Sequence, residues 1–322
     1  MTLLVAFCVL TAAKAASPYD NPDTLVVSRD GTGQFRTINE AVEVCRAFME
    51  YHKVIYVKNG VYKEKIVIPS WLTNIEICGE SVENTIITYD DHANIRLVET
   101  NKPMGTFRTY TVKVEGTDIT FKNITIENNA ARLGQAVALH TEGDRLVFVN
   151  CRLLGNQDTV YTGVGGTRVY FKDCYIEGTT DFIFGPSTAW FENCTIHSKQ
   201  NSYVTAASTP KDVVYGYVFN KCRLTAADGV TKVYLGRPWR PYAYTVFMNC
   251  ELGAHIVPAG WHNWNDAANE KTARYFEYNN TGAGAKTTER APWSRQLTKK
   301  EAAQITLENV FKTETSWIPV VK

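Results

Sequence analysis

The 322-residue sequence has almost no excess charge of either sign. It contains 34 Lys and Arg against 33 Asp and Glu, a formal net charge of +1, and the basic residues are scattered along the chain. Nucleic acids and anionic membranes are bound through concentrated positive charge. The composition therefore argues against either of them as a partner.

Long hydrophobic runs are also missing. A transmembrane helix needs roughly 18 or more consecutive apolar residues, and no stretch of the chain reaches that length. The apolar run 3–10 is too short to span a bilayer, and Ala13-Lys-Ala15 behind it offers small residues for cleavage. Residues 1–16 are therefore predicted to be a signal peptide, although no Lys or Arg precedes the run, and the protein is predicted to be secreted and extracellular.

The sequence lacks two common catalytic or structural patterns. Its six His are dispersed, and no paired Cys-x-x-Cys spacing occurs, so neither a metal site nor a cofactor is expected. No Gly-x-Ser-x-Gly stretch is present, which leaves a serine-based hydrolase with little support.

The chain does contain a repeat. In each copy, a Phe is followed three residues later by Cys or Ile and five residues later by Ile or Leu. The copies begin at Phe121, Phe148, Phe171, Phe191, Phe219 and Phe247, at intervals of 27, 23, 20, 28 and 28 residues. A recurring unit of this size indicates a solenoid.

Each copy is typical of one short strand, because β-forming residues such as Phe, Ile and Thr partly alternate with polar ones. The rest of each unit has room for two more short strands and their turns. The expected fold is therefore all-β, a parallel β-helix that forms a single domain over residues 17–322. The recurring Phe, Cys and Ile or Leu side chains would form stacked columns inside it.

Two carboxylates occupy the same place in adjacent repeats. Asp158 and Asp181 each follow the Phe of their own repeat by ten residues. If insertions fall later in each coil, the two lie on neighbouring rungs, with carboxyl groups on the order of 5 Å apart. The coils before and after carry Ala131 and Asn201 at this offset, so the acidic pair is local.

Cysteine is sparse, with eight residues, of which Cys8 lies in the predicted signal peptide. The remaining seven cannot all pair within the chain. Most of them recur at the interior position of the repeat, where small buried hydrophobic side chains are expected. Cys174 and Cys194, on neighbouring rungs in an oxidising compartment, are the best candidates for a disulfide.

The two ends of the chain carry helix signals. Thr37 and Glu40 form a capping box that predicts an amphipathic helix through Met49, which would close the end of the solenoid. Thr298 and Glu301 predict a short terminal helix, packed with the C-terminal tail along the outside. Early strands are predicted at 24–28, 54–57, 65–68 and 74–78.

Some residues remain open between interpretations. Asn123, Asn193 and Asn279 begin glycosylation sequons, and Asn279 is the preferred acceptor because the first two adjoin the interior column. Trp261 and Trp264 could line a cleft or cover the end of the barrel.

Five stretches are too specific to be scaffold alone. They are Gly60-Val-Tyr62-Lys-Glu64, Gln135-Ala-Val-Ala-Leu139, Gln157-Asp158-Thr-Val160, Asp181-Phe-Ile-Phe-Gly185 and Leu235-Gly-Arg237-Pro-Trp239. In this order and spacing they resemble the pectin methylesterases, carbohydrate esterases that act on methylated homogalacturonan. The resemblance runs from about Thr24 to the C-terminal region, with Val160 standing where the family often has Leu.

The resemblance implies a right-handed parallel β-helix and metal-free ester hydrolysis by two aspartates. Asp181 would be the nucleophile that forms an acyl-enzyme, and Asp158 the general acid and then base. Gln135 and Gln157 would form the oxyanion hole, while Arg237 holds Asp181. Tyr161, Phe184 and Trp239 would line the sugar cleft. The expected partner is pectin, bound by a monomer, and Tyr62 and Glu64 are interpreted as structural.

The chemistry of these residue types agrees with the implied roles. Ester hydrolysis needs a nucleophile, a proton donor for the leaving methoxide and donors for the oxyanion. Two charges about 5 Å apart repel by roughly 3 kcal/mol at an effective dielectric near 20, or about 2 pKa units, so one carboxyl would keep its proton. Two alternatives remain: a pectin lyase or polygalacturonase, and a non-catalytic carbohydrate-binding β-helix.

Overall fold

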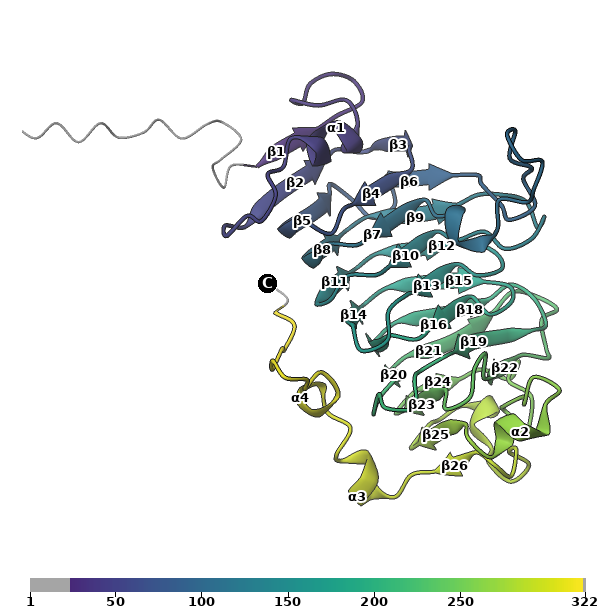
Figure 1. Cartoon of the computed structure of the whole chain (residues 1–322). Helices are drawn as coiled ribbons and strands as arrows, with labels where there is room; N and C mark the ends of the chain where they lie inside the picture. The colour runs from purple at the N-terminus through teal and green to yellow at the C-terminus, as the bar shows by residue number, and fades with distance from the viewer. Residues whose placement is uncertain (1–23, 321–322) are drawn as a thin grey trace, which may run out of the picture.

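Short parallel strands wind the chain into an elongated β-helix (Figure 1). The computed structural model describes residues 24–320, so the predicted signal peptide and Cys8 lie outside the described residues. The strands form three sheets, and the pairs between named strands in the described part are parallel. The predicted parallel β-helix is confirmed. A right-handed coil is also what strand–crossover–strand connections between parallel strands almost always adopt.

The eleven-stranded sheet consists of β1 (Leu25–Val27), β2 (Lys53–Val57), β5 (Thr73–Gly79), β8 (Thr117–Lys122), β11 (Leu146–Val149), β14 (Arg168–Lys172), β17 (Thr188–Glu192), β20 (Tyr217–Asn220), β23 (Tyr244–Met248), β25 (Arg274–Tyr278) and β26 (Arg295–Gln296). The seven-stranded sheet consists of β4 (Ile66–Ile68), β7 (Val112–Val114), β10 (Leu139–Thr141), β13 (Val160–Thr162), β16 (Ile183–Gly185), β19 (Tyr203–Ala207) and β22 (Tyr234–Gly236). The eight-stranded sheet consists of β3 (Gly60–Lys63), β6 (Thr85–Tyr89), β9 (Thr125–Asn128), β12 (Arg152–Leu154), β15 (Tyr175–Gly178), β18 (Thr195–Ser198), β21 (Arg223–Ala226) and β24 (Glu251–Leu252).

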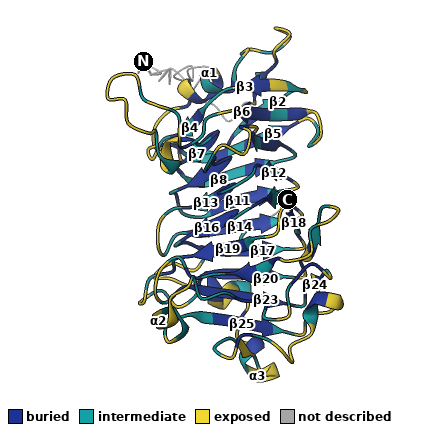
Figure 2. Ribbon diagram, turned by 90° about the vertical axis from the view of Figure 1, so that its right-hand side faces the viewer, coloured by how far each residue is buried: buried dark blue, intermediate teal, exposed yellow. Residues whose placement is uncertain are grey.

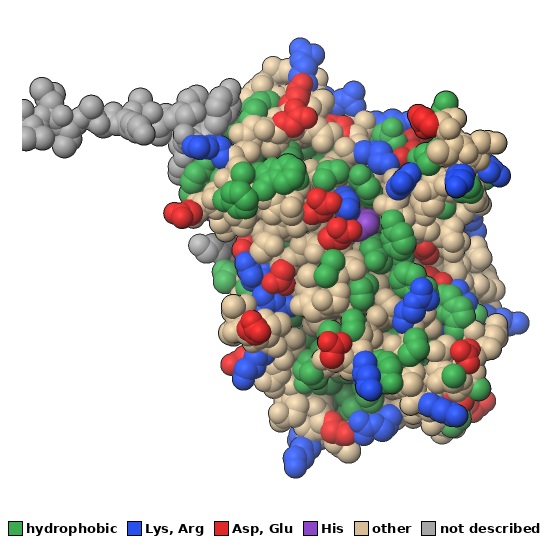
Figure 3. All heavy atoms as spheres, viewed as in Figure 1, with side chains coloured by type: hydrophobic (Ala, Val, Ile, Leu, Met, Phe, Trp, Pro, Cys, Tyr) green, Lys and Arg blue, Asp and Glu red, His purple; other side chains and the backbone are tan. Residues whose placement is uncertain are grey.

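Helices in the described part of the chain are few and short. They are α1 (Ile38–Glu43), α2 (Ala267–Glu270), α3 (Lys299–Ala302) and α4 (Leu307–Val310), with 3-10 turns η1 (Thr106–Arg108) and η2 (Ala283–Ala285). None of the helices in residues 24–320 is long and apolar enough to cross a bilayer. Buried residues concentrate in the strands, whereas exposed residues gather in the loops (Figure 2). Acidic and basic side chains are interspersed over the face drawn in Figure 3.

The repeated Phe positions form one interior column, as predicted. Phe121, Phe148, Phe171, Phe191, Phe219 and Phe247 are in register and fully buried. Successive rings stack with centroids 5.3, 5.0, 4.7, 4.4 and 4.3 Å apart. The spacing follows the distance between neighbouring strands, so the column packs the core along the coil axis.

The five buried cysteines of the repeat form a second column, but not the predicted disulfide. The seven cysteines of the described part are free thiols, and Cys174 and Cys194 are buried. Residues in register on parallel strands lie about 4.8 Å apart with parallel Cα–Cβ bonds, whereas a disulfide needs a Cβ–Cβ distance near 3.8 Å. Each thiol donates to backbone instead, for example from Cys174 Sγ to the carbonyl oxygen of Phe148 at 3.4 Å. The prediction of a Cys174–Cys194 disulfide is wrong.

Helix α1 covers the N-terminal end of the coil, as expected, but is shorter than predicted. Its capping box between Thr37 and Glu40 is present, and Ile38 is buried. The helix ends at Glu43. It cannot extend to Met49, because Phe48 adopts left-handed backbone with φ of 56° and its N–H donates to the carbonyl of Trp71.

The early motif around Gly60 is structural, as interpreted. The carboxylate of Glu64 accepts from the backbone N–H groups of Ile38 and Asn39, both at 3.1 Å. A carboxylate in this position satisfies free donors in the first turn of α1 and complements the helix dipole. Tyr62 is buried, and its hydroxyl donates to the carbonyl of Lys58 at 2.8 Å.

The sequons begin at equivalent turns that follow strands of the eleven-stranded sheet. Asn123, Asn193 and Asn279 all adopt left-handed backbone, with φ of 51°, 53° and 50°. Asn193 adjoins the interior column but is exposed like Asn279, so its position in the repeat gives no reason to prefer Asn279 over it. Glycosylation of these sites stays a prediction.

The C-terminal segment packs along the outside of the tube, as predicted (Figure 1). Its capping box at Thr298 starts α3, and Ile305, Val310 and Phe311 then join a hydrophobic cluster on the outer face of the eleven-stranded sheet. Arg168 on β14 anchors this segment. Its side chain is 2 % exposed.

The guanidinium of Arg168 bridges the sheet to the tail. It donates to the carboxylate of Asp144 through Nη2 at 2.6 Å and through Nε at 3.0 Å. It also donates through Nη1 to the carbonyls of Phe311 at 3.1 Å and Thr315 at 2.7 Å. One buried cation therefore satisfies three acceptors from distant parts of the chain.

Arg168→Met is expected to lower the free energy of unfolding by roughly 2–3 kcal/mol. It leaves two carbonyls without their charged donor and leaves the carboxylate of Asp144 with only its longer ion pair to Arg145, at 3.2 Å. Urea unfolding checks the value. Arg223→Met is the matched control, since the exposed ion pair of Arg223 with Glu251 should contribute less than about 1 kcal/mol. Equal losses in both variants would contradict the anchoring role.

Candidate active site

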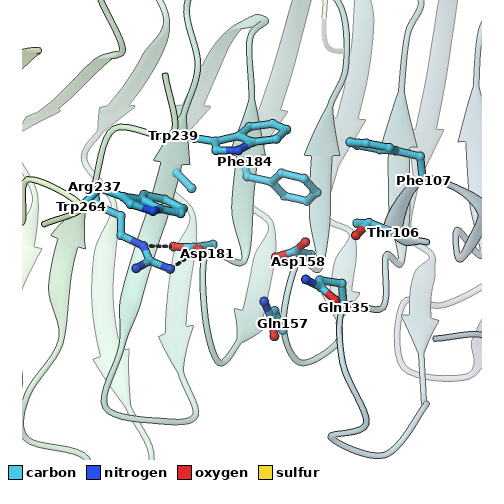
Figure 4. Close-up of a pocket in the computed structure, with 11 residues that line it drawn as sticks. Thr106, Phe107, Gln135, Gln157, Asp158, Asp181, Phe184, Arg237, Trp239 and Trp264 are labelled. Atoms are coloured by element: carbon cyan, nitrogen blue, oxygen red, sulfur yellow. Dashed lines mark hydrogen bonds and ion pairs between the residues drawn. The ribbon is translucent and has the colours of Figure 1, made fainter. Parts of the chain in front are cut away.

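The two predicted aspartates lie side by side at the start of adjacent strands of the seven-stranded sheet (Figure 4). Asp158 precedes β13 and Asp181 precedes β16, and these strands pair with Val160 opposite Ile183. The N–H of Asp158 donates to the carbonyl of Thr180 at 3.1 Å. The predicted placement on neighbouring rungs is therefore confirmed. Both residues are mostly buried, with exposed fractions of 8 % for Asp158 and 6 % for Asp181.

Both aspartates adopt left-handed backbone, with φ of 66° at Asp158 and 49° at Asp181. Asp tolerates this region better than most residues because its short side chain can bond locally. The turn interrupts the strand alternation and directs both carboxylates into the same pocket.

Counting ten residues from the Phe of each repeat does not identify the neighbours of the aspartates on the rungs before Asp158 and after Asp181. The pairing of Leu139 with Val160 and of Ile183 with Thr205 places Val137 and Tyr203 beside the aspartates. Ala131 and Asn201 are therefore not the equivalent residues. Coil length varies before this position as well as after it: Leu139 follows the Phe of its repeat by 18 residues, but Val160 follows its own by 12.

Arg237 holds Asp181 through two parallel hydrogen bonds. Nε donates to Oδ1 at 2.9 Å and Nη2 donates to Oδ2 at 2.6 Å (Figure 4). Arg237 directly follows β22, and its own N–H donates to the carbonyl of Thr205 at 2.9 Å. Such a two-pronged contact favours the ionised carboxylate and fixes its orientation.

The two carboxyl groups differ in how firmly they keep a proton. Burial, followed by the charge of Asp181, raises the pKa of Asp158 well above its usual range, and Arg237 offsets this only in part. Burial also raises the pKa of Asp181, but the hydrogen bonds and charge of Arg237 oppose the rise. Asp158 is therefore the carboxyl that stays protonated longer. Repulsion alone, the cause assumed from the sequence, is the smaller contribution.

The predicted amides belong to the same pocket. Its volume is about 250 Å³, and it is lined by Thr106, Phe107, Gln135, Gln157, Asp158, Asp181, Phe184, Ala206, Arg237, Trp239 and Trp264. Figure 4 shows the side chains of Gln135 and Gln157 beside Asp158. Within residues 24–320, no three His, Cys, Asp or Glu side chains are arranged to hold a metal ion.

The three predicted aromatics form a row, but only two line the pocket. Phe184 and Trp239 do, with ring centroids 5.8 Å apart. Tyr161 extends the row, 4.8 Å from Phe184 and 4.9 Å from Phe107. Phe107 was missed because it stands on η1, in a long segment outside the repeat.

The two undecided tryptophans have different positions. Trp261 is 2 % exposed and packs against Tyr275 inside the end of the core, with ring centroids 4.4 Å apart. Trp264 lines the pocket and lies over the guanidinium of Arg237, with Cζ 3.7 Å from its ring centroid. Each of the two interpretations left open therefore holds for one residue.

The fold and the pocket together define a parallel β-helix protein with paired carboxylates, amides and aromatic rings on one sheet. A family model described as Pectinesterase matches residues 24–314, and the chain belongs to that family.

Individual relatives agree with this assignment. The chain is 40% identical over 285 residues to Pectinesterase 31 of Arabidopsis thaliana, covering 86% of this chain and 88% of that protein. Pectin methylesterase from carrot superposes with a TM-score of 0.83 at 34% identity, covering 89% of this chain and 92% of the carrot chain. A pectin methylesterase solved in complex with a hexasaccharide superposes with a TM-score of 0.80 at 31% identity, covering 92% of this chain and 98% of that chain.

Proposed function

We propose that this protein hydrolyses the methyl esters of galacturonate residues in pectin and releases methanol, with Asp181 as nucleophile and Asp158 as proton donor. The proposal rests on two neighbouring carboxyl groups that differ in how readily they ionise. One is held by the two-pronged contact of Arg237, and the other is buried beside it with a raised pKa. Membership of the pectinesterase family supports the substrate class.

The first half of the reaction forms an acyl-enzyme. A carboxylate oxygen of Asp181 attacks the ester carbonyl carbon, and the carbonyl oxygen becomes an oxyanion that accepts hydrogen bonds from the amides of Gln135 and Gln157. The intermediate then breaks its bond to the methoxy oxygen while Asp158 donates its proton, so methanol leaves. The galacturonyl carbon remains bonded to Asp181 as an anhydride, and Asp158 is left as a carboxylate.

The second half restores the enzyme. Asp158, now ionised, removes a proton from water as the water oxygen attacks the same carbonyl carbon. Collapse of this intermediate breaks the bond to Asp181 and releases a galacturonic acid group. Asp181 returns to its ionised form beside Arg237, and Asp158 is protonated again.

The aromatic row would supply the sugar contacts. Tyr161, Phe184, Trp239 and Phe107 offer ring faces and edges next to the paired carboxyls. Sugar rings carry apolar C–H faces that pack well on such surfaces. With Asp158 protonated, the opposite charges of Asp181 and Arg237 leave the pocket without net charge, which suits a partly esterified polymer.

The proposed biological setting follows the sequence. Residues 1–16 would direct secretion, and residues 17–322 would act as a monomeric extracellular domain on pectin. N-terminal sequencing of protein recovered from the culture medium of an expressing eukaryotic cell tests cleavage after residue 16. Retention of the whole chain inside the cells would contradict it.

Methanol release from methylated pectin tests the function. The expected result is methanol formation without new reducing or unsaturated chain ends, and with no loss of rate in EDTA, because the proposed chemistry needs no metal. Shortened chains would instead indicate a depolymerase. Binding of pectin without methanol would indicate a non-catalytic module. Loss of activity in EDTA and its return with calcium, at constant pectin solubility, would contradict the metal-free mechanism.

A further inference from the structure

The guanidinium of Arg237 lies between two aromatic rings. Its Cζ is 3.9 Å from the ring centroid of Tyr203 and 3.7 Å from that of Trp264. Tyr203 begins β19, and Trp264 lies between β24 and α2, in left-handed backbone with φ of 62°. Distances this short place both rings in direct contact with the cation, well within the roughly 6 Å range of a cation–π interaction.

A further layer of rings supports this arrangement. Tyr234 packs against Tyr203 with ring centroids 5.3 Å apart, and His262 contacts both rings at 5.2 Å. The backbone N–H of Trp264 donates to Nδ1 of His262 at 3.0 Å. The imidazole therefore links the two sides of the arrangement, so neither ring next to Arg237 stands alone.

Tyr203 also contacts the nucleophile strand through its backbone. The N–H of Asp181 donates to the carbonyl oxygen of Tyr203 at 2.9 Å. Tyr203 therefore binds the main chain of Asp181 through its backbone, and its ring covers one face of the Arg237 guanidinium that holds the Asp181 carboxylate. Tyr203 is not among the residues that line the pocket, whereas Trp264 is.

We propose that Tyr203 is a positioning residue, which together with Trp264 fixes the plane of the Arg237 guanidinium so that both of its donors meet the carboxylate of Asp181. This inference rests on the proposed function. A guanidinium with free space above and below can rotate about its side-chain bonds, and rotation breaks one of the two parallel hydrogen bonds. Two rings in contact leave only the productive plane.

The charges around the pair agree with this role. Asp181 faces Arg237 and Asp158, and buried Tyr275 lies within electrostatic range of it. Behind the rings stands His262, whose pKa is lowered by burial and by the charge of Arg237. A neutral imidazole does not repel the guanidinium, so the supporting layer adds no second cation.

Tyr203→Leu tests the inference with methylated pectin as substrate. We expect kcat to fall roughly tenfold, the order of effect of losing a desolvated cation–π contact, while KM changes less than about twofold. The acid limb of the kcat profile should also move to higher pH. A looser Arg237 opposes protonation of Asp181 less, so the pKa of Asp181 rises and more alkaline conditions are needed to ionise it.

Two further variants separate positioning from general damage. Tyr203→Phe keeps the ring and is expected to restore most of kcat and the original acid limb. Tyr175→Leu is the matched control, because Tyr175 packs under Arg152 with Cζ 5.7 Å from the ring, on the eight-stranded sheet away from the pocket. It should leave both kcat and the acid limb unchanged.

The outcomes are distinguishable from failure of the proposed function. Absence of methanol release by the unmodified protein would refute the function itself. A Tyr203→Leu protein with normal kcat and an unmoved acid limb would overturn the inference alone, as would a loss that Tyr203→Phe does not restore. If the Leu variant does not fold, Tyr203→Met takes its place with the same criteria, since Met fills the volume without an aromatic face.

Discussion

Asp181→Asn is expected to reduce methanol release by at least about 10⁴-fold, because an amide cannot attack the ester carbon as a carboxylate does. Pectin binding should remain within about threefold of the unmodified protein, since the aromatic row is unchanged. The two quantities are measured by methanol assay and by calorimetric titration with methylated oligogalacturonides.

The same variant also reports on Asp158. Because burial raises the pKa of Asp158 more than the charge of Asp181 does, Asp158 should keep most of its elevated pKa when that charge is removed. Carboxyl NMR of the Asp158 side chain in the variant measures this directly. A return of its pKa to the ordinary range would assign the shift to repulsion between the aspartates instead.

Asp173→Asn provides the matched control for this substitution. Asp173 also occupies a left-handed turn, with φ of 54°, but this turn follows β14 of the eleven-stranded sheet, and the carboxylate accepts from the amide of Asn193. Its replacement should leave activity unchanged. A fully folded Asp181→Asn protein that keeps a tenth of the normal rate would rule out Asp181 as the nucleophile.

The repeat explains why so much of the fold could be predicted. A stacked Phe column forces every coil to present equivalent residues at the same height, so counting from the Phe correctly placed Asp158 beside Asp181. The count works for these two coils because both have the same length up to β13 and β16. It fails for Val137 and Tyr203, where the preceding arcs are longer, and nothing in the repeat marks those insertions.

The missed residues share one physical cause. Phe107 and Tyr203 acquire their roles from contacts with residues far away in the chain, Tyr161 and Arg237 respectively. Local periodicity carries no information on such contacts. The wrong disulfide has a related origin: the sequence shows that Cys174 and Cys194 are neighbours, but only the parallel Cα–Cβ bonds of adjacent rungs show that they cannot approach closely enough.

Asp158→Asn is expected to lower kcat for methyl esters by roughly 10²–10⁴-fold, the usual contribution of a positioned proton donor. Methoxide is a poor leaving group without that proton. An ester of a more acidic alcohol, such as a nitrophenyl ester of a galacturonate oligomer, needs no donor to leave. Its acylation by the variant should therefore be nearly normal, followed by slow hydrolysis, because water activation also uses Asp158. Rapid release of one equivalent of nitrophenol per protein, then a slow phase, is the expected trace.

The pH profile of the same variant gives an independent check. Activity of the unmodified protein requires ionised Asp181 and protonated Asp158, so it should rise through the pKa of Asp181 and fall through the higher pKa of Asp158. The amide introduced by Asp158→Asn is neutral, as protonated Asp158 is, so Asp181 meets the same surroundings and the acid limb should stay in place. The alkaline limb should disappear, because the substituted side chain no longer titrates. Equal losses on methyl and nitrophenyl esters, or an alkaline limb that persists, would show that another group donates the proton.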